Sequence, residues 1–391
     1  MTLEDFLSPL RHRFIETFGD CHPQSFFHSV DKHLEIEGLP DLEHAKLAIF
    51  GVLEDRASHN PGAAQGPDEV REYLYRLFPG QWSGKIVDLG NIYAGETPRD
   101  TYVAVSEVCA TLIKQQIIPV VLGGSQDITY GCYRAYDQLE QTVNLVSVDA
   151  RIDLGSQESK TTTAENYLSH VVLQQPYILF NYANLGHQTY FVNQEELALL
   201  DRMYFDAVRL GELRNNIRET EPYFRDADLV SFDIGAIRQS DASGNAFHSP
   251  NGFSGEEACG LARYAGISDK VTNFGVYEYN PTKDRDGRTA HLIAQMVWYF
   301  IEGVHSRKGD YPFASKADYE KYTVLINEGE HELIFYRSPL SGRWWIEVPM
   351  NDGNQLKSER HKLIPCSYYD YTEAAKNEIP ARWWQAMKKA L

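Results

Sequence analysis

The amino-acid sequence predicts an α/β fold built around a mainly parallel β-sheet. Short β-branched or apolar runs recur between residues 48 and 277, and most of them are separated by segments long enough for a helix. Strands that alternate with helices are typical of a parallel sheet covered on both faces and connected by right-handed crossovers. The chain of 391 residues is long enough to bury such a core. The pattern alone leaves open whether the sheet is open or closed into a barrel.

Eight strands and their intervening helices are expected in chain order. Residues 1–45 are expected to form a helical, polar lead-in. The strands follow at residues 48–53, 86–89, 118–122, 143–148, 177–182, 206–210, 228–233 and 271–277. Segment 102–117 places apolar side chains on one helical face, namely Val105, Val108, Cys109 and Leu112. The pattern stops near residue 306, so we expect the main domain to span residues 46–306.

Residues 310–391 predict a small additional α+β unit. Runs 322–326 and 332–336 flank a short acidic turn, which indicates a hairpin, and run 344–348 is a candidate third strand. The last segment is expected to be helical on either side of Pro380. Four tryptophans could form a recognition surface, but we expect them to form the core of this unit: Trp344, Trp345, Trp383 and Trp384.

The composition restricts the partners and the compartment. The chain has 55 acidic and 37 basic residues, a formal net charge of -18. This charge disfavours nucleic acid and anionic membranes and favours a small cationic or neutral ligand. The five cysteines are scattered without a CxxC pair, so we expect free thiols rather than a disulfide framework or a zinc site. We find neither a signal-peptide core nor a run approaching the about 18 apolar residues of a membrane span, and we expect a cytoplasmic protein.

Polar side chains follow four of the predicted strands. GGSQD at residues 123–127 follows the third strand, and DARID at residues 149–153 follows the fourth. The seventh strand ends at Asp233, and Glu278 follows the eighth. Functional groups of parallel α/β folds lie at these carboxyl ends, where the loops converge. We therefore expect one site formed by Gln126, Asp127, Asp149, Arg151, Asp153, Asp233 and Glu278.

Several of these residues could have a structural role instead of a role in the site. Asp149 and Asp233 could cap helices, although the order of the motifs favours the site. Asp127 could turn inward as a ligand, but we expect it to be a surface or capping residue. Three histidines are candidate proton shuttles or ligands without a supporting spacing: His170, His187 and His248. The second of them follows a predicted strand and is expected to be exposed in a loop.

The motifs, taken in order, resemble those of a known family. GxxxGP begins at Gly62 and is followed by GG-S-Q-D, S-V-D-A-x-x-D, S-F-D and E-x-N-P. This order, across residues 45–305, resembles the ureohydrolases (arginase, agmatinase and, most of all, formimidoylglutamase). The resemblance implies a three-layer α/β/α domain with a central parallel eight-stranded sheet. It also implies a homo-oligomer that hydrolyses C–N bonds of linear amidines, guanidino or formimino compounds, with two manganese ions that bridge a hydroxide.

The resemblance also implies a ligand set, which this chain matches in part. Family members have a histidine ligand where this chain has Gln126. In the next motif, Asp149 and Asp153 are retained as ligands, whereas Arg151 stands in place of the central histidine. Asp233 is retained as well. Three carboxylates of six implied ligands are therefore present.

Two further positions complete this comparison. Gly235 stands where the family has a second aspartate of the S-x-D-x-D motif. Glu278 matches the acidic residue that contacts the guanidinium-like end of the substrate. The resemblance thus implies Asp149, Asp233 and Glu278 as catalytic residues. Asp149, Asp153, Asp233 and Gln126 are the implied metal-binding residues.

Electrostatics bears on whether Mn2+ can bind there. Two divalent ions about 3.5–4 Å apart need enough anionic and imidazole donors to hold them. A guanidinium has no acceptor lone pair and cannot be a metal ligand. Two unit charges 4 Å apart interact by roughly 4 kcal/mol at an effective dielectric constant near 20, so a divalent ion at this distance from a guanidinium would be repelled by about twice that energy. We therefore hypothesise that Arg151 folds inward, offers its bidentate fork to two of the three aspartates and replaces the metal as counter-charge.

Two functional hypotheses follow from the sequence. In the first, the chain is a catalytically silenced ureohydrolase-fold protein that acts as a binding or structural protein. In the second, it is an active hydrolase of non-peptide C–N bonds in linear amidines, with an altered site that holds one metal ion. We favour the first because of Arg151.

Overall fold

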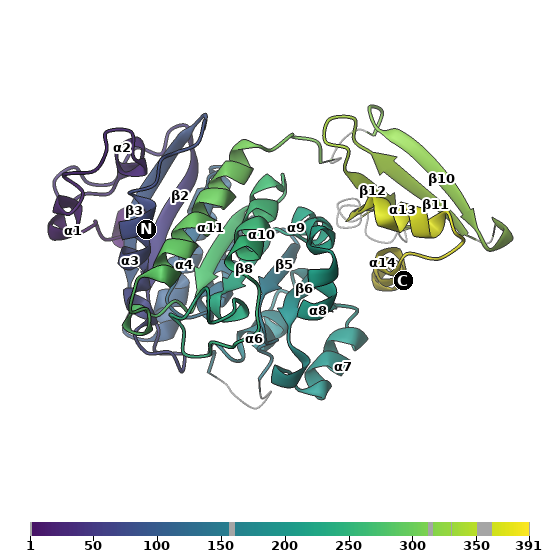
Figure 1. Ribbon diagram of the computed structural model, residues 1–391, viewed down its shortest axis with the longest axis horizontal. Helices are drawn as coiled ribbons and strands as arrows, with labels where there is room; N and C mark the ends of the chain where they lie inside the picture. Colours follow the sequence, from purple (N-terminus) through teal and green to yellow (C-terminus); the bar gives the residue numbers. More distant parts are fainter. Residues whose placement is uncertain (1, 156–160, 312–315, 330, 350–361, 391) are drawn as a thin grey trace.

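The main domain is built on an open parallel sheet (Figure 1). The computed structural model describes residues 2–155, 161–311, 316–329, 331–349 and 362–390. Nine strands lie in the order β1-β3-β2-β4-β9-β8-β5-β6-β7, and every pairing between neighbours is parallel. The sheet has two edges and is not a barrel, which resolves the alternative left open by the strand pattern.

The strands confirm the predicted set and add one. Their bounds are β1 Asp31–Lys32, β2 Ala45–Leu53, β3 Lys85–Tyr93, β4 Ile118–Leu122, β5 Val143–Val148, β6 Leu179–His187, β7 Asp206–Arg209, β8 Leu229–Asp233 and β9 Asn273–Tyr277. The additional strand β1 has only two residues, too few for a periodic pattern in the sequence. Strand β6 begins two residues later than predicted and continues through His187.

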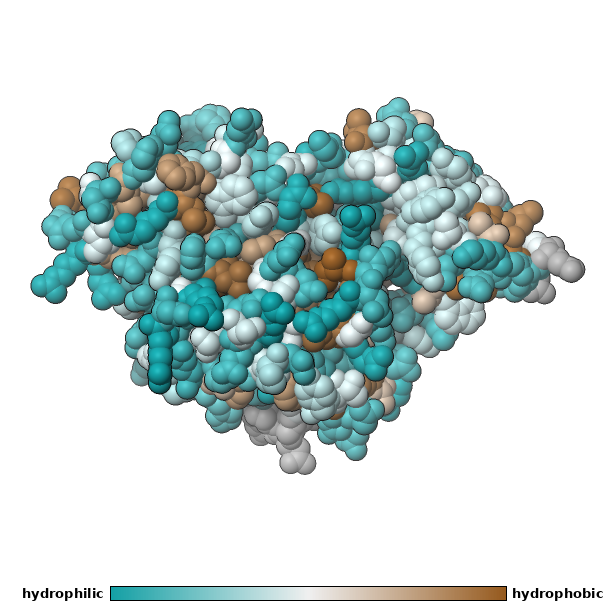
Figure 2. All heavy atoms as spheres, viewed as in Figure 1, coloured by the Kyte–Doolittle hydropathy of each residue, from teal (hydrophilic) through white to brown (hydrophobic). Residues whose placement is uncertain are grey.

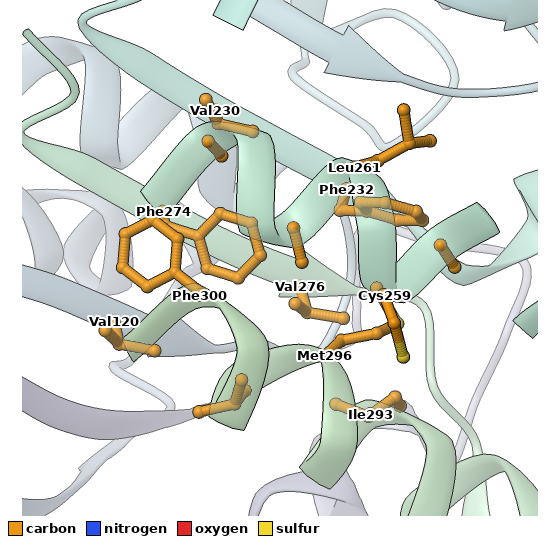
Figure 3. Packing of buried hydrophobic residues seen from close by; sticks show 14 of the residues in the cluster. Val120, Val230, Phe232, Cys259, Leu261, Phe274, Val276, Ile293, Met296 and Phe300 are labelled. Carbon is orange, nitrogen blue, oxygen red and sulfur yellow. The ribbon is translucent and has the colours of Figure 1, made fainter. Parts of the chain in front are cut away.

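Helices cover both faces of the sheet, as the strand and helix alternation predicts. Along β4, Val120 and Leu122 belong to one hydrophobic cluster, whereas Val121 belongs to the other. The first cluster includes side chains of α3 (Gly66–Leu74), α10 (Gly255–Ile267) and α11 (Arg288–His305). Figure 3 shows part of it, with Phe274 of β9 stacked on Phe300 of α11 at 4.3 Å between ring centroids. This alternation places a packed layer on each face.

The second layer covers the other face of the sheet. It includes side chains of α4 (Pro98–Lys114), α5 (Ile128–Arg134), α6 (Tyr167–Leu173) and α7 (Gln194–Arg202). Helix α4 confirms the predicted helix, with Val105, Val108, Cys109 and Leu112 all buried. The remaining helices of the domain are short: α1 His12–Glu16, α2 Phe26–Ser29, α8 Leu210–Asn215 and α9 Glu221–Asp226. The domain is thus a three-layer α/β/α structure.

The C-terminal unit is an antiparallel sheet with two helices. Its strands are β10 Glu320–Ile326, β11 His331–Arg337, β12 Trp344–Glu347 and β13 Leu363–Cys366, in that spatial order. The helices are α13 Tyr368–Ala374 and α14 Ala381–Ala390. The predicted hairpin and third strand are confirmed, and β13 was not predicted. Three of the four tryptophans are buried, but Trp384 is 40% exposed, so the core prediction fails for that residue.

The C-terminal unit packs on the edge of the main sheet where the strands begin. Arg225 of α9 is 2% exposed, and its guanidinium donates hydrogen bonds to the carbonyls of Trp344 and Cys366, each at 2.8 Å. The same guanidinium lies 4.6 Å from the ring centroid of Trp345. A cavity of about 60 Å³ between the two parts is lined by Asn144 at the start of β5 and by residues of α14. The described part of this unit therefore lies away from the carboxyl ends of the strands.

Polar side chains dominate the face of the molecule seen in Figure 2, where hydrophobic ones form small scattered groups. Among the described residues, none of the helices combines the length and the hydrophobicity that crossing a membrane requires.

Arg225 is expected to hold the two parts of the chain together. Arg225→Ala leaves two buried carbonyls without their donor, and we expect the free energy of unfolding to fall by about 3 kcal/mol. Denaturant unfolding measures this loss. The matched control is Arg209→Ala, which removes an exposed ion pair with Glu212 and should change stability by less than about 0.5 kcal/mol. Equal stability of the two variants would contradict the role given to Arg225.

Candidate functional site

The four predicted strand ends meet in the sheet. Strands β4, β9, β8 and β5 are consecutive neighbours, so the loops after them lie side by side. Six predicted site residues are buried at these ends, each exposed by 8% or less: Gln126, Asp127, Asp149, Asp153, Asp233 and Glu278. A cavity of about 30 Å³ is lined by Gln126, Arg151, Asp153, Ala164, Glu165, Asp233, Phe247 and Glu278. Its volume suits a water molecule or the end of a small ligand.

The loop after β5 has a fixed backbone. The amide N–H of Arg151 donates to Oδ1 of Asp149 at 2.8 Å, and Nδ2 of Asn184 donates to the carbonyl of Arg151 at 2.6 Å. Asp153 has a left-handed backbone with φ 55°, a conformation that aspartate tolerates better than most residues. These contacts, from the adjacent strand β6 and from the loop itself, determine where the Arg151 side chain emerges.

Burial and mutual repulsion make it unfavourable for all carboxyl groups of the site to ionise together. Burial raises the pKa of Asp153 well above its usual range, and the neighbouring Asp149 raises it further. Burial and the charges of Asp149 and Glu278 likewise raise the pKa of Asp233, although its Oδ1 accepts a hydrogen bond from the amide of Gly235 at 2.6 Å. Burial also raises the pKa of Asp149, and its interaction with Asp153 opposes this rise. The site therefore carries less negative charge than its composition suggests.

Arg151 does not make the bidentate contact that we hypothesised. Its guanidinium carbon lies 4.8 Å from the ring centroid of Phe191 and 5.1 Å from that of Phe247. It forms no ion pair within 4.0 Å and no side-chain hydrogen bond with any residue that the structure describes. The faces of the two rings attract the cation and hold it at the mouth of the cavity. Its charge still acts on the carboxyl groups over a longer distance and opposes the rise in the pKa of Asp153 and of Asp233.

Glu278 is bound on both oxygens by other parts of the chain. Its Oε1 accepts from the amide of Gln126 at 2.9 Å, and its Oε2 accepts from Nδ2 of Asn60 at 2.9 Å and from Oγ of Ser58 at 3.2 Å. Burial raises the pKa of Glu278 to about 7. Its backbone is left-handed, with φ 65°. The sequence did not point to Ser58 or Asn60, because neither forms a motif and both lie more than 200 residues away along the chain.

The environment of Asp127 differs from the prediction. Asp127 is fully buried, and the hydroxyl of Tyr102 on α4 donates to its Oδ2 at 2.5 Å. It precedes α5 but makes no capping hydrogen bond with its side chain. The expectation of a surface or capping residue is therefore wrong. Burial raises the pKa of Asp127 to about 6.

The three candidate histidines lie apart from the cavity. His187 is 2% exposed at the end of β6, so the expected exposed loop position is wrong, and burial lowers its pKa. Nδ1 of His248 contacts the carbonyl of Asn245 at 2.7 Å, and His170 packs edge-on against Tyr130. None of the three belongs to the described residues that line the cavity.

The donor set does not fit a pair of divalent metal ions. In the described part of the chain, no group of three or more His, Cys, Asp or Glu side chains is arranged to hold a metal ion. The side-chain amide nitrogen (Nε2) of Gln126 lies 3.4 Å from each of three hydroxyl groups, those of Ser147, Tyr167 and Ser231. Gly235 offers no ligand, and Arg151 contributes a positive charge. Too few anionic donors remain for two such ions.

Comparison with known proteins gives the wider context. An open parallel sheet with a buried polar site at its carboxyl ends places the chain among the doubly wound α/β proteins. A model described as the arginase family matches residues 45–302, and the chain belongs to this family. The resemblance found in the motifs is thereby confirmed.

Individual relatives are similar along most of the main domain. Formimidoylglutamase from Staphylococcus aureus strain JH9 is 26% identical over 299 residues, which cover 73% of this chain and 95% of that protein. Formiminoglutamase from Trypanosoma cruzi with Mn2+ has a TM-score of 0.62 at 20% identity, covering 68% of this chain and 95% of the other. Formimidoylglutamase from Bacillus subtilis also has a TM-score of 0.62, at 21% identity, covering 68% and 90%. The solved structures establish the fold.

The buried Asp127 makes stability depend on pH. Because its pKa is raised in the folded state, the wild-type protein loses stability as pH rises from the unfolded-state value toward about 6. Asp127→Asn keeps an acceptor for Tyr102 and removes the charge. The stability of the variant relative to wild type should increase by about 1 kcal/mol between about pH 5 and about pH 7.

Denaturant unfolding at the two pH values measures this difference. A variant whose stability relative to wild type is the same at both would show that Asp127 does not titrate there.

Proposed function

We propose that this chain is a formimidoylglutamase-like member of the arginase family that has lost dimanganese hydrolysis and acts as a binding or structural protein. The observation that supports this most strongly is Arg151, a cation fixed between two aromatic rings at a position where the family resemblance implies a metal ligand. We further propose that its ligand is a small cation of the amidine type and that the protein assembles from copies of itself.

Charge supports the loss of the metal pair. The positive charge of Arg151 acts on the carboxyl groups from more than 4.0 Å away and would repel a divalent ion bound among them. The raised pKa values of Asp153 and Asp233 favour their protonated forms, which is another way to reduce repulsion among the buried carboxyl groups. Protonation and the charge of Arg151 would both reduce the negative charge of the site without metal.

A second candidate is an active hydrolase of C–N bonds in linear amidines with one metal ion. Three aspartates implied as ligands remain buried at adjacent strand ends, namely Asp149, Asp153 and Asp233. Glu278, with a pKa raised to about 7, would be a suitable proton acceptor or donor near neutral pH.

Turnover distinguishes the two candidates. The protein is incubated with manganese and formiminoglutamate, agmatine, arginine or guanidinobutyrate, and formamide or urea is measured. We expect no product above that of the Asp149→Asn variant. Turnover that disappears in Asp149→Asn would establish the hydrolase instead.

Restoring the missing ligands should restore metal binding. The triple variant Gln126→His, Arg151→His, Gly235→Asp supplies two imidazoles and a carboxylate and removes the fixed cation. A side chain at Gly235 has room, because its Cβ would meet the movable carboxyl of Asp233 first, at 3.1 Å. We expect the triple variant to bind manganese at least about tenfold more tightly than wild type, corresponding to about 1.4 kcal/mol.

Manganese electron paramagnetic resonance during titration measures this affinity. Arg151→Lys is the matched control, because it retains the positive charge and should gain no affinity. Equal affinities of the triple variant and of the lysine variant would contradict the argument from ligands and charge.

A further inference from the structure

Two aromatic rings contact the guanidinium of Arg151, which lines the cavity together with four acidic side chains. We propose that the rings of Phe191 and Phe247, with the acidic lining of the cavity, form a receptor for a planar cation, and that Arg151 occupies this receptor as an internal ligand. The receptor blocks its own mouth in the wild-type chain. This inference deepens the proposed function by identifying what holds the site closed.

The contacts of the guanidinium support this assignment. Its carbon lies within 5.1 Å of both ring centroids, over the ring faces. A planar, delocalised and weakly hydrated cation is the kind that stacks on aromatic faces. Within the described chain, its N–H groups have no hydrogen-bond partner, so the rings hold it rather than a salt bridge.

The backbone places Arg151 between the rings before any ligand arrives. Hydrogen bonds from Asn184 and to Asp149 fix its carbonyl and its amide at 2.6 and 2.8 Å. The amide of Gln188 donates to the carbonyl of Ala150 at 3.0 Å, which ties the segment leading to Phe191 to the same loop. The position of the guanidinium is therefore set by several independent contacts.

The second ring is positioned from the opposite side of the site. Nδ2 of Asn245, a fully buried residue, donates to the carbonyl of Glu278 at 3.0 Å, and its Oδ1 accepts from the amide of Phe247. Phe191 ends a short 3-10 helix, Thr189–Phe191, and packs edge-on against Tyr190 at 4.7 Å between ring centroids. Two loops that are distant in sequence thus present one ring each.

The acidic lining of the cavity favours a positively charged ligand. Four acidic side chains line it together with Phe247: Asp153, Glu165, Asp233 and Glu278. Even a partly protonated set of carboxyl groups offers hydrogen-bond acceptors to amidinium or guanidinium N–H groups and disfavours an anion. Removing the Arg151 side chain should therefore create a binding site for a small planar cation.

Arg151→Ala tests this directly, with methylguanidinium as the probe and a chelator present throughout. We expect millimolar methylguanidinium to raise the Tm of Arg151→Ala by about 2 °C more than sodium chloride at equal ionic strength. The wild-type protein, in which an external cation must first displace Arg151, should show a much smaller difference. Calorimetric titration should detect clearly tighter binding to the variant.

The double variant Arg151→Ala, Phe247→Ala is the matched control and should lose the response. A single variant that does not respond, or a double variant that responds equally, would overturn the proposal. Because the chelator removes metal, this result is independent of whether the wild-type protein binds manganese or turns over an amidine, so the two proposals fail separately.

A second measurement keeps the proposal testable if Arg151→Ala does not fold. The Nε–H resonance of Arg151 in the wild-type protein should show slowed side-chain rotation and ring-current shifts. Phe247→Ala should weaken both effects, and the double variant Phe191→Ala, Phe247→Ala should abolish them. A resonance with the shift and mobility of an exposed arginine in the wild-type protein would overturn the proposal.

Discussion

The carboxyl groups that converge at the ends of β5 and β8 set the main physical constraint on this protein. The parallel sheet brings Asp149, Asp153 and Asp233 together, and burial makes their simultaneous ionisation unfavourable. Some positive charge must compensate them, whether protons, a metal ion or a side chain. We propose that protons and the guanidinium of Arg151 serve that purpose in this chain. The guanidinium lies over the aromatic rings of Phe191 and Phe247.

The fold and the chemistry of the site depend on different features of the sequence. Membership of the arginase family and the likeness to solved formiminoglutamase structures concern the backbone fold. This fold requires only the pattern of strands and helices. Two-metal hydrolysis needs donors at particular strand ends as well, and Gln126, Arg151 and Gly235 change those donors without disturbing the strands. The C-terminal unit is tied to the opposite edge of the sheet through Arg225. The site and the C-terminal unit therefore lie at opposite ends of the strands.

The sequence predicted the sheet well because buried parallel strands are apolar runs with clear boundaries. It predicted that Gln126, Asp149, Asp153, Asp233 and Glu278 would meet, because carboxyl ends of parallel strands share one edge. It could not predict the direction of Arg151, since the two rings come from residues 191 and 247, which no local pattern links to residue 151. The burial of Asp127 depends in the same way on Tyr102 from a different helix.

The manganese content of the wild-type protein tests the central claim most directly. The protein is equilibrated with excess manganese, freed of unbound ion by gel filtration and analysed for metal and protein in the same fractions. Replacement of the metal pair by protons and Arg151 predicts much less than one manganese ion per chain. A value near two ions per chain, as expected of a two-metal hydrolase, would contradict the account.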